Sequence, residues 1–146
     1  MTEEPKTPDL EEGLGSPTDA EAKVRAYFER FNETRGSQLE ALHPEINWHI
    51  RADLPGSRTL HGYEDVMRRD ADWKQAFGDL QLQPIEVDEA LGETVVLVHF
   101  HGRIKGRGDI VDMHEVWVLS WHGDRIIEIR EYKNKAEALK AVESAK

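Results

Sequence analysis

The sequence predicts a single α+β domain in which helices cover one face of a curved antiparallel sheet. Three observations support this prediction. Apolar residues recur at helical spacing in the first half of the chain. From Leu80 onward they alternate with a period of two, and short turns divide that region into segments. At 146 residues, the chain is long enough for one hydrophobic core and too short for two.

The helical half begins with a capping box, because Thr18 and Glu21 have the S/T-x-x-E spacing found at helix N-termini. The apolar residues that follow share one helical face; they are Val24, Tyr27, Phe28 and Phe31. Gly36 ends this helix. A short second helix is expected over SQLEALH, residues 37–43, before Pro44.

A strand and a third helix complete this half. Residues 46–50 alternate as a strand does, with Ile46, Trp48 and Ile50 on one side. Residues 51–62 read as loop, with a turn at Pro55 and Gly56. Gly62 opens the third helix, whose apolar stripe is Tyr63, Val66, Met67, Trp73 and Phe77. Asp70 falls on this stripe, either as a pocket residue or, more simply, as a solvated residue at its edge.

The second half predicts an antiparallel meander. Strands are expected near residues 80–91, 94–105, 109–122 and 125–132. The last segment, AEALKAVE, is a short amphipathic helix. The domain therefore spans residues 18–146.

Composition excludes several classes of function. Residues 1–17 lack apolar periodicity and read as a disordered acidic tail. Six acidic residues against Lys6 in the first twenty positions supply five of the ten net negative charges, so no cationic surface for nucleic acid is expected. The absence of cysteine excludes disulfides and thiol chemistry. Without a signal peptide or a membrane-length apolar run, we expect a soluble cytoplasmic protein that has no membrane partner.

The first hairpin of the meander can be registered from its turn. If Gly106 and Arg107 are the central turn residues, His101 pairs with Asp112 and His99 with His114 on one face. The pairs on the other face are Phe100 with Met113, Val98 with Glu115, and Val96 with Trp117. Because the second set is nearly all apolar, it is expected to face the helices.

The next hairpin allows two registers, and burial favours one. A two-residue turn at Gly123 and Asp124 mixes core and surface residues, whereas a three-residue loop from His122 keeps one face apolar. That face consists of Trp117, Leu119, Ile127 and Ile129, and the same register places Glu115 directly opposite Glu131. If two such carboxylates lie together in a partly buried site, desolvation and mutual repulsion raise the pKa of one of them toward the range useful for acid/base catalysis. Alternatively, the site is wet, or Arg51 or Arg103 neutralises one of them.

Four segments resemble a known family. ALHPEINWHI, LHGYEDV, HEVWVLSWHGDRIIEIREY and KAEALKAV are similar to the SnoaL-like branch of the nuclear-transport-factor-2-like superfamily, which includes ketosteroid isomerase. The resemblance covers about residues 19–144 and implies a cone-shaped fold with an internal cavity. It also implies a small-molecule enzyme that performs isomerisation, cyclisation or hydration without a cofactor, or a non-catalytic binding or interaction domain of the same fold.

The resemblance also implies roles for particular residues. Glu115 and Glu131 correspond to the acid/base positions of polyketide cyclases, and Tyr27 is similar to the oxyanion tyrosine of ketosteroid isomerase. The catalytic aspartate of that isomerase falls on Ile50, so its mechanism is not carried over. The limonene-epoxide hydrolase arrangement of Asp, Arg and Asp is not recognisable.

The remaining candidates line the expected pocket or lie outside it. An apolar or aromatic ligand is expected against Trp48, Ile50, Tyr63, Trp73, Val98, Phe100 and Trp117, with Trp121 also near the cone. His99, His101, His114 and Asp112 gather on the outer face, where their spacing suits either a metal or an ordinary exposed surface. No metal is assigned, and this outer face is expected to form a homodimer.

Overall fold

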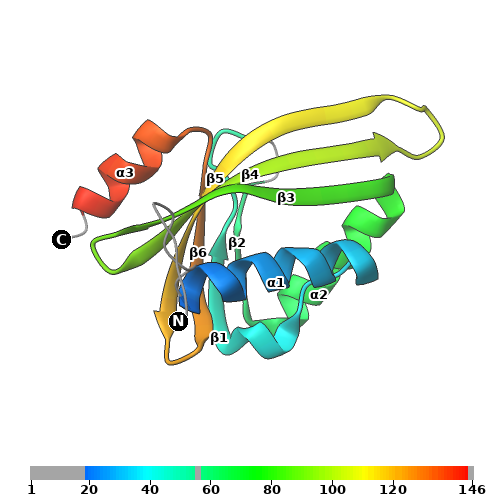
Figure 1. The fold of residues 1–146 in the computed structure, drawn as a ribbon. Helices are drawn as coiled ribbons and strands as arrows, with labels where there is room; N and C mark the ends of the chain where they lie inside the picture. Colours follow the sequence, from blue (N-terminus) through cyan, green and yellow to red (C-terminus); the bar gives the residue numbers. More distant parts are fainter. Residues whose placement is uncertain (1–18, 55–56, 145–146) are drawn as a thin grey trace, which may run out of the picture.

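A computed structural model describes residues 19–54 and 57–144. The expected acidic tail and the turn at Pro55 and Gly56 lie outside the described residues. The elements, in order, are α1 (Asp19–Thr34), η1 (Leu39–Ala41), β1 (Leu42–His49), β2 (Thr59–His61), α2 (Gly62–Ala76), β3 (Phe77–Ala90), β4 (Glu93–Ile104), β5 (Ile110–His122), β6 (Arg125–Tyr132) and α3 (Lys135–Ser144) (Figure 1). None of the helices in the described part of the chain has the length and apolar character needed to cross a membrane.

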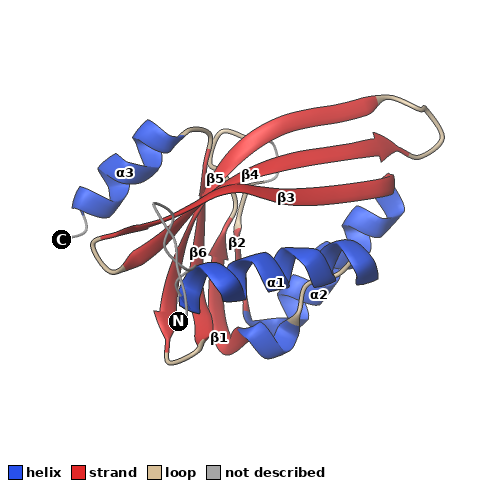
Figure 2. Ribbon diagram, in the orientation of Figure 1, coloured by secondary structure: helices blue, strands red, loops and turns tan. Residues whose placement is uncertain are grey.

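One six-stranded sheet forms the body of the protein, in the order β2-β1-β6-β5-β4-β3. Strands β3 to β6 are the predicted antiparallel meander. Strand β1 joins the free edge of β6 in parallel, and β2 pairs antiparallel with β1. The helices α1 and α2 lie together on one side of the curved sheet (Figure 2). The predicted α+β architecture is therefore confirmed.

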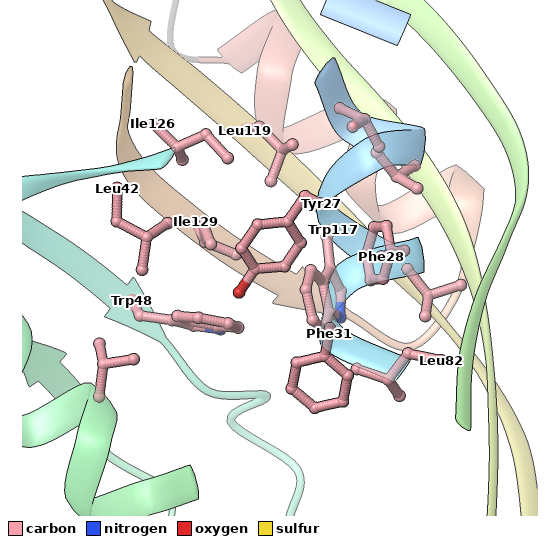
Figure 3. Packing of buried hydrophobic residues seen from close by; sticks show 14 of the residues in the cluster. Tyr27, Phe28, Phe31, Leu42, Trp48, Leu82, Trp117, Leu119, Ile126 and Ile129 are labelled. Carbon is pink, nitrogen blue, oxygen red and sulfur yellow. The ribbon is translucent and has the colours of Figure 1, made fainter. Parts of the chain in front are cut away.

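The main core lies between α1 and the inner face of the sheet. The four residues of the predicted helical stripe, Val24, Tyr27, Phe28 and Phe31, are all buried. They pack against alternate strand residues such as Trp117, Leu119 and Ile129 (Figure 3). Burial of each large apolar side chain stabilises the fold by about 1.5–3 kcal/mol relative to exposure. The helical and strand periodicities of the sequence thus meet in one apolar layer.

A second, smaller core lies on the outer face of the sheet. Val116 and Val118 alternate with the inward Trp117, so they point to the opposite side. There they pack with Val95 against Ala138 and Val142 of α3. Both faces of this part of β5 are covered, which explains its continuous apolar run, VWVL.

Several predicted boundaries are wrong for identifiable reasons. The expected second helix is only the 3-10 turn η1, because Leu42 pairs with Ile126 of β6 and is fully buried as the start of β1. The expected loop contains β2, in which buried Leu60 pairs with Trp48. On α2, Met67 is 55% exposed because Val66 beside it faces the core.

The end of α2 and the position of Asp70 also differ from expectation. Phe77 begins β3 instead of ending the helical stripe. Asp70 is buried and is not a solvated residue. Its two carboxylate oxygens accept hydrogen bonds from the Ser37 backbone N–H at 2.8 Å and from the Ser37 hydroxyl at 3.0 Å. Asp70 thereby fixes the segment that leaves α1 against α2.

Candidate active site

The register of β5 and β6 sets the position of the two candidate glutamates. Trp117, and not Glu115, lies opposite Glu131, so the predicted cross-strand pair is wrong by two residues. At the turn Trp121 pairs with Ile126, as expected for the two-residue turn at Gly123 and Asp124, which the burial pattern did not favour. A bulge then inserts Ile127 into β6 between Ile126 and Glu128, so Ile126, and not the predicted Ile127, is buried in the core. Beyond the bulge, Trp117, Leu119 and Ile129 share the inner face, as predicted.

Because the error is an even number of residues, Glu115 and Glu131 still share the inner face. Glu115 is 4% exposed. Its carboxylate accepts a hydrogen bond from the Trp117 indole N–H at 3.0 Å and lies 3.5 Å from Nη1 of Arg51. Burial raises the pKa of Glu115, while Trp117 and Arg51 counteract that rise.

Glu131 is the more strongly perturbed acid. It is 9% exposed and accepts hydrogen bonds from the Trp48 indole N–H at 2.8 Å and from the Arg51 backbone N–H at 3.3 Å. Burial, followed by the negative charge of Glu115, raises the pKa of Glu131 to about 7. Glu131 is therefore able to give or take a proton near neutral pH.

Two arginines were expected as neutralising partners, and only one reaches the pair. Arg51 contacts both glutamates, and its guanidinium is also tied to Asp53 by hydrogen bonds of 2.7 and 3.0 Å. Arg103 instead donates to the Gly108 carbonyl in the exposed β4–β5 turn. The pair is therefore both perturbed and partly neutralised, since Arg51 compensates part of the negative charge while the pKa of each glutamate stays raised.

Arg69 is a site residue that the sequence reasoning missed. Its guanidinium lies between two indoles, with its central carbon 4.2 Å from the ring centroid of Trp48 and 3.9 Å from that of Trp73. Burial lowers the pKa of Arg69, and negative charges, led by Glu131, counteract this. The available signal was spacing, because Arg69 follows Val66 by three positions and so shares its buried helical face.

A cavity of about 320 Å³ connects these groups. Glu115, Glu131 and Arg69 contribute to its wall, and much of the remainder is apolar, from Ile50, Trp73, Phe77, Phe100, Val111 and Met113. Of the other expected ligand contacts, Trp48, Val98 and Trp117 are buried in the core behind this wall. The Tyr63 hydroxyl donates to the Leu42 carbonyl at 2.7 Å, away from the cavity.

Tyr27 does not join the glutamates in this cavity. It borders a separate hollow of about 270 Å³, together with Trp121 and Ile126. Its hydroxyl points toward Trp48 (Figure 3). Burial raises the pKa of Tyr27 to about 12, and the nearby Ser37 side chain counteracts part of this rise. The hydroxyl makes no hydrogen bond of good geometry to a described residue.

The outer histidines form a surface cluster. Nε2 of His99 lies 2.8 Å from Oδ1 of Asp112, and the rings of His99 and His114 stack at 4.8 Å between centroids. Within residues 19–54 and 57–144, no group of three or more His, Cys, Asp or Glu side chains is arranged to hold a metal ion. This cluster is on the opposite face of the sheet from the cavity.

The chain has a curved, open sheet with α1 and α2 on its inner face and a cavity between these layers, and it shares the nuclear-transport-factor-2-like fold, also called ketosteroid isomerase-like. No family model matches the sequence, and no curated protein matches it. Solved structures do match. A protein of unknown function from Burkholderia pseudomallei K96243 is 22% identical, with a TM-score of 0.66 over 82% of this chain and 93% of that one.

Two further structures are similar. A candidate SnoaL-like polyketide cyclase from Jannaschia sp. CCS1 is 16% identical, with a TM-score of 0.62 over 88% of this chain and 97% of that one. A protein with a ketosteroid isomerase-like fold from Catenulispora acidiphila DSM 44928, in complex with trimethylamine, is 14% identical, with a TM-score of 0.65 over 75% of this chain and 83% of that one. Similarity at this level confirms the predicted fold and does not identify a reaction.

Proposed function

We propose that this protein is a small-molecule enzyme that transfers protons without a cofactor, in an isomerisation, cyclisation or hydration. The observation that carries the proposal is the placement of Glu115 and Glu131 on one wall of a largely apolar cavity. The raised pKa of Glu131, about 7, supports its role as the general acid or base. The similarity to a candidate polyketide cyclase agrees with this at the level of fold.

In this mechanism Glu131 removes a proton from a carbon that a neighbouring carbonyl group makes acidic. The same residue, or Glu115, then returns the proton at another position of the ligand. Arg51 stabilises whichever carboxylate is ionised, because it contacts both of them. The proposal does not use the Tyr27 hydroxyl, which borders the other hollow.

Hydrogen–deuterium exchange tests this function before the substrate is known. The protein is incubated in D₂O with a panel of small cyclic 1,3-diketones and aryl ketones, and the loss of α-proton signals is followed by NMR. Glu131→Gln is expected to lower the exchange rate by about 10²–10⁴-fold, the usual contribution of a general acid or base. Glu115→Gln is expected to lower it as well.

Glu128→Gln is the matched control, because Glu128 is on the same strand and bonds to His49 outside the cavity. It is expected to retain wild-type exchange. Wild-type exchange no faster than buffer for every compound, or full activity in both cavity variants, would contradict the proposal.

A ligand-binding module is the second candidate. One observation favours it: each cavity glutamate is already held by a buried indole N–H, from Trp48 or Trp117, which suits a rigid receptor. A compound that raises the melting temperature without any catalysed exchange would favour this alternative.

A further inference from the structure

Two of the three guanidinium nitrogens of Arg69 have no hydrogen-bonding partner among the described residues, although the side chain is almost fully buried. Only 4% of the residue is exposed, and neither Nε nor Nη2 makes a hydrogen bond to any described residue. The nearest carboxylate oxygen paired with it, Oδ1 of Asp70, is 3.8 Å from Nε, and that oxygen already accepts from the Ser37 hydroxyl. A buried cation without hydrogen bonds is costly, so such a group needs an explanation.

The side chain is nevertheless held in one orientation. Trp48 and Trp73 pack on the guanidinium at 4.2 and 3.9 Å, and Trp48 is itself fixed by its hydrogen bond to Glu131. Because the two indoles cover its faces, a planar acceptor can reach the guanidinium only at its edge, where the N–H donors lie; Nε and Nη2 are buried there, and Nη1 is the nitrogen outside this buried, unpartnered set. Arg69 also forms part of the cavity wall, beside Trp73 and Phe100.

We propose that Arg69 is the receptor for an ionised oxygen of the ligand, so that the cavity prefers a small, flat acid to a neutral molecule of the same shape. The acid is a carboxylate, or a phenol or enol acidic enough to ionise. Its oxygen accepts from the Arg69 guanidinium, and its ring lies against Trp73 and Phe100. An acid of this kind would be the substrate class of the enzyme proposed above, and its role as a substrate rests on that proposed function.

The entry of a ligand into the cavity explains why an anion is preferred to a neutral molecule. A ligand that fills the cavity expels its water, so a neutral apolar molecule leaves the Arg69 charge more desolvated than before. An anion supplies the missing acceptor and the opposite charge in one group. The volume of about 320 Å³ is near the lower end of ligand cavities, which span about 300–1,000 Å³, so the acid carries one or two rings.

A pair of probes with one shape and two charges tests this. 2-Naphthoate and 2-naphthamide are titrated into the full chain, and binding is measured by calorimetry. The wild type is expected to bind the naphthoate at least about tenfold more tightly, as an ionic hydrogen bond is stronger than a neutral one. Arg69→Gln is expected to abolish the preference, and Arg69→Lys to keep only part of it, because lysine lacks the planar fork.

Arg103→Gln removes one positive charge outside the cavity wall and is expected to preserve the preference. Equal affinities for the two probes in the wild type, or a preference that persists in Arg69→Gln, would overturn the inference. A preference that is lost in Arg58→Gln and kept in Arg69→Gln would also overturn it, since it would move the anion to the exposed arginine of the wall.

A measurement on the unaltered protein covers the case in which Arg69→Gln does not fold. The ¹⁵Nε resonance of Arg69 is expected to shift with the naphthoate and not with the naphthamide; equal shifts, or none, would refute the contact. These assays need no turnover. A naphthoate preference without catalysed exchange would thus contradict only the enzyme proposal, and exchange that depends on Glu131 without that preference would contradict only the Arg69 proposal.

Discussion

Glu131 gives the protein a pH-dependent stability that one substitution isolates. Burial and the charge of Glu115 raise the pKa of Glu131 from 4.5 to about 7 in the folded chain. Between these two values the folded protein holds a proton that the unfolded chain has released, so the free energy of unfolding falls as the pH rises. The raised pKa of Glu131 adds about 3 kcal/mol to the free energy of unfolding. This contribution is fully present below pH 4.5 and is lost as the pH rises through about 7.

Urea unfolding of the wild type and of Glu131→Gln at pH 5 and pH 8 measures this difference. Glutamine has the shape of the protonated carboxyl and cannot ionise. We expect the wild type to lose about 2–3 kcal/mol more than Glu131→Gln between the two pH values. The groups that favour the ionised form, Arg69, the Trp48 indole and the Arg51 amide, are already included in the raised pKa of Glu131.

Glu33→Gln, on an exposed position of α1, is the control and should follow the wild type. If the wild type and Glu131→Gln lose the same free energy to within about 0.5 kcal/mol, the usual range of surface substitutions, then Glu131 is ionised at little cost and the reasoning fails.

Three other changes have defined outcomes. Glu115→Gln removes the charge that helps to raise the pKa of Glu131, so ¹³C NMR should show the Glu131 carboxyl titrating at a lower pH; an unchanged titration would mean that the two acids are not coupled. Gly102→Ala places a methyl group 2.8 Å from Cδ1 of Phe77, and chemical denaturation should show a loss of about 1–3 kcal/mol; wild-type stability would mean that Phe77 moves freely. We also propose that the histidine cluster on the outer face forms a homodimer contact, which His101→Glu should break in light scattering; a monomeric wild type would exclude it.

The meander and its first hairpin could be predicted because they depend on local information. The turn at Gly106 fixes the pairing of Val98 with Glu115, and alternation assigns the faces. The pairing of β1 with β6 could not be predicted, since a parallel pairing between strands far apart in the sequence leaves no turn to read. The position of α3 on the outer face was equally hidden, although the unbroken apolar run of β5 was consistent with cover on both sides.

At the candidate site, the sequence indicated the two glutamates and missed the cation between the indoles. Glu115 and Glu131 interrupt apolar strands, so alternation alone assigns them to the inner face. Arg69 follows Arg68 and reads as part of a charged helix surface, because helical position by itself does not show which polar residue is enclosed. The bulge at Ile127 was missed because a three-residue loop places Trp117, Leu119 and Ile129 on the same face without it; the loop differs only in burying Ile127 in place of Ile126.

Three tryptophans in the cavity wall or directly behind it provide an intrinsic optical reporter. Trp48 donates to Glu131, Trp117 donates to Glu115, and Trp73 covers Arg69, so any change of charge in the cavity alters the electric field on three indoles. Trp121 bonds to Thr94 and borders the other hollow, which makes it the internal reference. Emission spectra of single-tryptophan variants can therefore follow cavity occupancy without a label.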